Sequence, residues 1–100
     1  MVLHPAFEKG IRLGFLISQM ERIDQGELFS RAAVLPEELR RTFETLHTTY
    51  VPDRLLFDVS VEEVFRLTAA VLEIPEEELR EGLEASVETA RELMENGMEP

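Results

Sequence analysis

The chain has 100 residues, of which 44% are hydrophobic, and this is enough to form one ordinary domain with a buried core. It contains no cysteine, which excludes disulfides, thiolate metal sites and thiol nucleophiles. Its net charge of −11 disfavours nucleic acids and anionic membranes as partners, because both present negatively charged phosphates.

The start of the sequence carries no basic segment followed by an apolar one, so we expect no secretory signal peptide. The longest apolar stretch, at residues 11–17, is interrupted by Arg12 and is much shorter than the roughly 20 residues that cross a bilayer. We therefore expect a cytoplasmic protein that has no membrane as a partner.

The first predicted helix begins near Pro5 and runs to about Asp24. Its apolar residues form two adjacent stripes, which is more of the circumference than one neighbouring helix covers. Small domains often complete their cores by oligomerising, and twofold dimers are the commonest result. We therefore expect a homodimer formed through this helix, although a central helix in a monomer is the alternative. The residues expected to self-associate are Phe7, Ile11, Leu13, Phe15, Leu16, Ile17 and Met20.

Turn-forming residues separate the next elements. The Gln-Gly pair at residues 25–26 predicts the end of the first helix, and residues 27–34 predict a short second helix. A third helix is predicted from Pro36, because proline suits the first turn and the two glutamates after it favour the positive end of the helix dipole. β-branched residues and Pro52 predict that this helix ends near residue 48.

Residues 53–59 are ambiguous, and we expect a connector whose apolar residues at positions 55–57 fill the core. Ser60, with glutamate three residues later, forms a capping box that opens a fourth helix. Pro75 starts the last helix, which runs to about Glu95. These elements predict an all-α fold, a compact bundle of four to five short helices with short connections, in a single domain spanning the whole chain.

The negative charge is concentrated near the end of the sequence. Residues 1–60 carry a net charge of −2, whereas residues 61–100 carry −9. Glutamates recur every three to four residues in the last predicted helix, so they share one face. This face is either a solvated surface or a docking site for a basic protein. The residues proposed to bind such a partner are Glu77, Glu81, Glu84, Glu88 and Glu92.

The pattern at residues 61–83 resembles the helix-turn-helix unit of DNA-binding proteins. Ala69, Ile74 and Leu79 occupy its small and apolar positions. However, Glu73 stands where such units usually have glycine, and the second helix begins with three glutamates that would repel phosphate. We therefore interpret the pattern as a helical corner and expect no direct nucleic acid binding.

Support for catalysis is weak. Glu44 and His47 have the spacing of a metal-ligand pair in di-iron helical bundles, but the sequence holds no second copy, so we expect no metal site. The sequence has no glycine-rich phosphate loop, and its two histidines offer few options for a general base. We therefore expect no catalytic residue, no cofactor and no enzymatic activity.

The sequence thus predicts a non-catalytic protein–protein interaction module, such as an adaptor, an assembly subunit or a small regulatory subunit, acting as a homodimer. The alternative is an acidic inhibitor or chaperone that masks the basic surface of a nucleic-acid-binding protein. A helix-turn-helix-like regulator is the third hypothesis, and a metal enzyme is the last.

Overall fold

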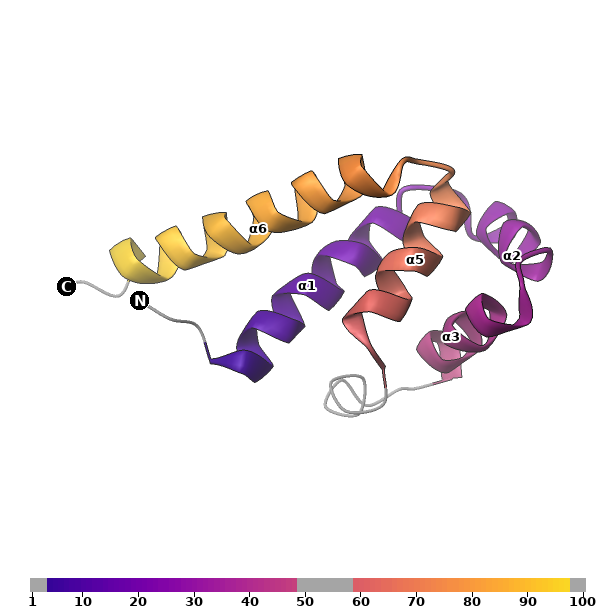
Figure 1. Cartoon of the computed structure of the whole chain (residues 1–100), viewed down its shortest axis with the longest axis horizontal. Helices are drawn as coiled ribbons and strands as arrows, with labels where there is room; N and C mark the ends of the chain where they lie inside the picture. Colours follow the sequence, from indigo (N-terminus) through magenta and orange to yellow (C-terminus); the bar gives the residue numbers. More distant parts are fainter. Residues whose placement is uncertain (1–3, 49–58, 98–100) are drawn as a thin grey trace.

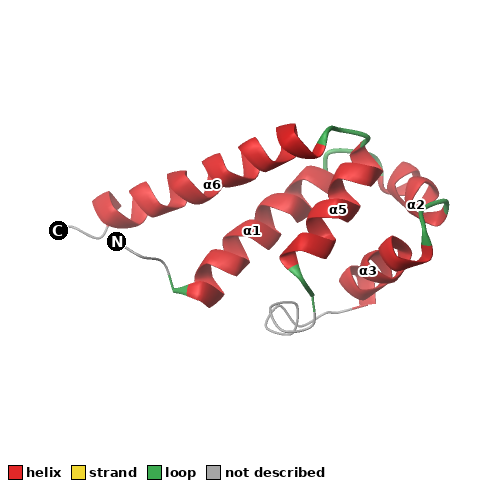
Figure 2. Cartoon of the chain, in the orientation of Figure 1, coloured by secondary structure: helices red, strands yellow, loops and turns green. Residues whose placement is uncertain are grey.

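The computed structural model describes residues 4–48 and 59–97, which form five helices. These helices are α1 (Pro5–Met20), α2 (Gln25–Ala33), α3 (Glu37–Thr48), α5 (Val61–Leu72) and α6 (Glu76–Gly97). No strand occurs in this described part of the chain (Figure 2), so the predicted all-α bundle of short helices is confirmed. The side chains at positions 55–57, which were expected to fill the core, lie outside the described residues.

Helix α5 lies in the middle of the bundle and contacts α1, α2, α3 and α6 (Figure 1). Apolar and small residues cover most of its circumference, and a helix of this kind must be buried on several sides. The residues that it buries are Val64, Phe65, Leu67, Thr68, Ala69 and Val71. The one hydroxyl in this set, on Thr68, donates a hydrogen bond of 2.7 Å to the Val64 carbonyl, so no polar group is left unsatisfied there.

Helices α1 and α6 lie side by side and run in opposite directions (Figure 1). Their contact is close at Gly82 of α6, where a side chain would begin 3.1 Å from the ring of Phe15. Glycine at this position therefore lets the aromatic ring pack directly against the backbone of α6. This contact fixes which side of α6 faces the bundle and, in consequence, which side faces solvent.

Capping side chains define where α2 and α5 begin. Asp24 caps α2, because its carboxylate accepts hydrogen bonds of 3.0 and 3.3 Å from the backbone N–H groups of Gly26 and Glu27. The pair at residues 25–26 thus begins a helix, so the prediction that it ends one is wrong, and α1 ends at Met20 instead of near Asp24. Ser60 caps α5 as predicted, since its hydroxyl accepts a hydrogen bond of 3.5 Å from the N–H three residues later.

The corner between α5 and α6 is built around Glu73, whose φ of 56° is in the left-handed region. The N–H groups of Glu73 and Ile74 both donate to the carbonyl of Ala69, which closes the end of α5. Ala69 and Leu79 are buried, and Ile74 packs against the core. The three positions that suggested a helix-turn-helix unit therefore pack the inside of the domain.

Candidate protein-interaction surface

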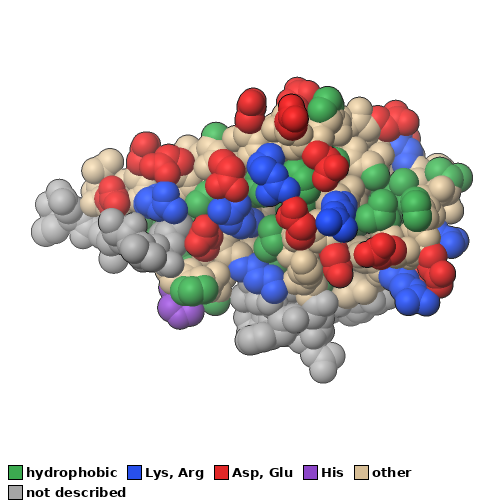
Figure 3. Space-filling view, in the orientation of Figure 1, with side chains coloured by type: hydrophobic (Ala, Val, Ile, Leu, Met, Phe, Trp, Pro, Cys, Tyr) green, Lys and Arg blue, Asp and Glu red, His purple; other side chains and the backbone are tan. Residues whose placement is uncertain are grey.

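The outer face of α6 is defined here as Glu77, Glu81, Glu84, Glu88 and Glu92, and all five residues are exposed. Their position follows from the helical repeat, because the buried residues of α6 occupy the opposite side. Those buried residues are Leu79, Leu83 and Val87. Figure 3 shows acidic side chains over α6, and on the side toward α1 and α5 it shows Lys and Arg side chains interspersed with further acidic ones.

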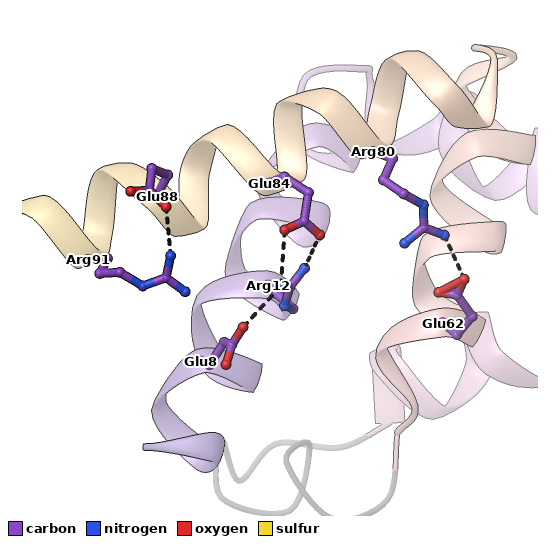
Figure 4. Close-up of polar contacts among 7 residues, drawn as sticks. All are labelled: Glu8, Arg12, Glu62, Arg80, Glu84, Glu88 and Arg91. Carbon is purple, nitrogen blue, oxygen red and sulfur yellow. Dashed lines mark hydrogen bonds and ion pairs between the residues drawn. The ribbon is translucent and has the colours of Figure 1, made fainter. Parts of the chain in front are cut away.

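Glu84 is the one member of the outer face that links two helices. Its carboxylate accepts hydrogen bonds of 2.6 and 3.2 Å from the two Nη atoms of Arg12 on α1 (Figure 4). Arg12 also donates to Glu8 at 3.0 Å, so it lies between two carboxylates. Hydrogen bonding to the Arg12 guanidinium lowers the pKa of the Glu84 carboxyl below its ordinary value of 4.5. Glu84 therefore has a structural role.

Two further arginines form ion pairs beside the outer face (Figure 4). Arg91 pairs with Glu88 of the same helix at 2.6 Å. Arg80 pairs with Glu62 of α5 at 2.6 Å and lies 4.1 Å from the centre of the Phe65 ring. Both arginines thus have partners that hold them on the flank of α6.

The remaining glutamates of the outer face are Glu77, Glu81 and Glu92. Their side chains make no hydrogen bond or ion pair with any residue that the structure describes. Of the five carboxylates predicted to bind a basic partner, two are thus engaged within the chain and three project into solvent. Sequence spacing located this face, but it could not separate the two groups, because Glu84 and Arg12 are 72 residues apart.

The residues predicted to self-associate form two groups in the structure, one packed in the chain's own core and one at its surface. Leu13, Leu16 and Met20 are buried in the chain's own core, with exposed fractions of 4% or less. Phe15 and Ile17 are half-buried and pack against this core. These five side chains are therefore largely engaged within the protein, which leaves the other two predicted residues as the part that a second copy can reach.

Those two residues lie near the start of α1. Phe7 is 49% exposed and Ile11 is half-buried, and both line a shallow apolar hollow. Gly14, one turn further along α1, is exposed and has open space where a side chain would begin. Self-association through α1 stays a prediction. The surface available for it is the patch around Phe7 and Ile11, which is smaller than the set of seven residues predicted from the sequence.

Glu44 and His47, which have the spacing of a metal-ligand pair but were expected to bind no metal, lie on α3. The ring of His47 packs against Phe43 and Phe29, with centroid distances of 4.2 and 4.9 Å. The described residues contain no cluster of three side chains suited to hold a metal ion. The aromatic cluster was not foreseen, because Phe29 reaches it from α2, although Phe43 and His47 are one helical turn apart.

Within the described ranges, no helix has both the length and the apolar character needed to span a bilayer. Comparison with protein-family models, with curated proteins and with solved structures finds no match. The function must therefore be inferred from the chemistry of the surface itself.

Proposed function

We propose that this protein is a non-catalytic protein-interaction module that binds a basic protein through the outer face of α6. The observation that supports the proposal is the set of three solvent-facing carboxylates, Glu77, Glu81 and Glu92, which have no partner among the described residues. Like charges one turn apart, as in Glu77 and Glu81, cost a helix a few tenths of a kcal/mol. A basic partner would relieve this repulsion and would be attracted from a distance.

The proposal includes a homodimer and a cytoplasmic setting. The exposed side chain of Phe7 and the half-buried one of Ile11 support the dimer, because they offer a second copy an apolar surface on the opposite end of α1 from the α1–α2 turn. The lack of cysteine fits a reducing compartment, where disulfides do not form.

A variant with Glu77, Glu81 and Glu92 changed to glutamine tests the docking face. The matched control changes Glu38, Glu63 and Glu73 to glutamine, since these residues are exposed and lie outside the outer face. Both variants lose three negative charges, so a general charge effect would appear equally in both.

The partner is first isolated by cross-linking in native cells, and its association with each variant is then timed at several salt concentrations. We expect the outer-face variant to associate at least about threefold more slowly and with a flatter salt dependence than the control variant. Equal rates and equal salt slopes for the two variants would show that the face is only a solvated surface.

A second candidate is an inhibitor or chaperone that masks the nucleic-acid site of its partner. The supporting observation is that the outer face places carboxylates every three or four residues, which is a rise of about 4.5–6 Å along one line. Such a line of negative charge resembles a phosphate backbone. If this candidate is correct, duplex DNA will displace the protein from its partner, whereas an adaptor would stay bound.

A further inference from the structure

A pocket of about 520 Å³ lies where the last turns of α1 and α3 meet the start of α2. Aliphatic side chains form most of its lining, among them Met20, Leu28 and Leu46. Glu21, Gln25 and His47 supply the polar part. A mostly apolar hollow of this volume with a few polar groups is typical of a site for a small organic molecule.

The electrostatics of the pocket favour a positive charge. Helix α1 ends at Met20 and α3 ends at Thr48, so two negative helix ends lie beside the pocket. The Asp24 carboxylate caps the start of α2 and offsets its positive end. Glu21 adds a carboxylate that is exposed and makes no ion pair with another described residue.

No lysine or arginine is found among the described residues that line this pocket. Arg22, which follows Glu21 in the sequence, donates a hydrogen bond of 3.2 Å to the side chain of Gln19 and borders a different hollow. Among the residues that the structure describes, no cation therefore pairs with the Glu21 carboxylate at the pocket.

Aromatic packing holds the His47 side of the pocket in place in the ligand-free protein. Its ring packs on Phe43 and Phe29, two side chains that come from different helices. Gln25 and His47 both carry atoms that can accept a hydrogen bond from an N–H donor. A fixed wall lowers the entropy lost on binding.

We propose that this pocket binds a small organic amine. The ammonium group would lie at Glu21 and donate hydrogen bonds to the polar side of the pocket, and the hydrocarbon or aromatic body would contact Met20, Leu28 and Leu46. This site is separate from the outer face of α6, so it constitutes a second binding function.

The test is a titration of the full chain followed by NMR of the backbone amides. The probes are 2-phenylethylamine, the neutral alcohol 2-phenylethanol, the anion 3-phenylpropionate, and ethylamine, which has almost no apolar body. We expect 2-phenylethylamine to shift the amides of the pocket residues. The alcohol should bind at least about fivefold more weakly, which corresponds to one partly exposed ion pair. The carboxylate and ethylamine should bind more weakly still.

The variant Glu21→Gln should lose most of the preference for the amine over the alcohol, because it keeps the apolar wall and the two helix ends and loses only the carboxylate charge. The control Glu38→Gln changes an exposed glutamate that does not line this pocket, and it should keep the preference for the amine. The proposal is overturned if the amine and the alcohol bind the native chain alike, or if no pocket amide shifts. Shifts confined to α6 would also overturn it, since they would report attraction to the acidic outer face.

Discussion

At the scale of single residues, the contact between Glu84 and Arg12 shows that equally spaced glutamates can have different roles. Glu84 and Glu92 both lie on the outer face of α6, yet only Glu84 is within reach of a cation on another helix. A substitution at Glu84 therefore removes a contact between helices, whereas one at Glu92 removes only a surface charge.

This difference predicts a pH dependence of stability. The pKa of Glu84 in the folded chain lies below its ordinary value of 4.5, so the pair stabilises the protein above about pH 4.5 and loses this effect as the pH falls through the lowered pKa. We expect Glu84→Gln to reduce the free energy of unfolding by about 0.5–1 kcal/mol at neutral pH, because Glu84 is half exposed and solvent screens the pair.

Urea unfolding at pH 7 and near pH 3 measures this effect, and the difference between native chain and variant should be smaller at the lower pH. Glu92→Gln is the control, and it should show no comparable loss at either pH. A Glu84→Gln penalty that is the same at both pH values would contradict the assignment.

Glu73 is the second residue with a distinct physical effect, because its left-handed backbone disfavours any side chain. Such a conformation costs roughly 1–2 kcal/mol for a residue with a Cβ atom, and glycine avoids this cost at some loss of entropy. We expect Glu73→Gly to raise the free energy of unfolding by about 0.5–1 kcal/mol, as measured by thermal or urea unfolding. Glu73→Ala should give no such gain, and an equal gain from alanine would mean that charge, not backbone, is responsible.

At the scale of the helices, the packing of α1 on α6 depends on glycine at one position and not at another. A side chain at Gly14 of α1 would enter open space, whereas one at Gly82 of α6 would meet the Phe15 ring at 3.1 Å. Glycine inside a helix costs about 1 kcal/mol relative to alanine. Gly14 and Gly82 therefore carry the same intrinsic cost, and the effect of replacing each one with alanine depends on the space around it.

We expect Gly14→Ala to stabilise the chain by about 0.5–1 kcal/mol and Gly82→Ala to give a smaller gain or a loss. Unfolding at low micromolar concentration measures both. Repeating Gly82→Ala in a Phe15→Leu background should recover much of the missing stability, because the clashing ring is then gone. If both alanine variants are stabilised equally in the native background, α6 does not approach α1 as closely as described.

Helix type and approximate bounds could be predicted because they depend on local patterns of apolar, capping and turn residues. The start of α2 was misread because Asp24 can cap one helix as readily as the adjacent glycine can end another. The candidate face on α6 was also found from local spacing. Its pairing with Arg12 was not, since that contact joins residues far apart in sequence and depends on how whole helices pack.

At the scale of the whole molecule, the net charge of −11 opposes the homodimer that the apolar patch on α1 favours. Two copies repel one another, and salt screens this repulsion. We therefore expect self-association to strengthen with added salt, whereas binding of a basic partner on the outer face of α6 should weaken. Varying the salt concentration can thus distinguish the proposed self-association from the proposed binding of a basic partner.

Light scattering at high micromolar concentration should give a dimer mass, and Phe7→Gln should return the chain to its monomer mass of 11.5 kDa. Val34→Gln is the control, because Val34 is also a large exposed hydrophobic residue but lies on the loop after α2. A monomer mass for the native chain at both low and high salt would refute the dimer.

The order of the helices also has a consequence for synthesis. Helix α1 is made before α5 and α6, the two helices against which it packs most extensively. At typical rates of translation the ribosome needs roughly 3–10 s to proceed from the end of α1 to the end of α5. During this interval the apolar side of α1, including Leu13, Leu16 and Met20, has not yet met those partners and is open to chaperones or to other nascent chains. Helix α1 is thus made several seconds before the two helices that cover it.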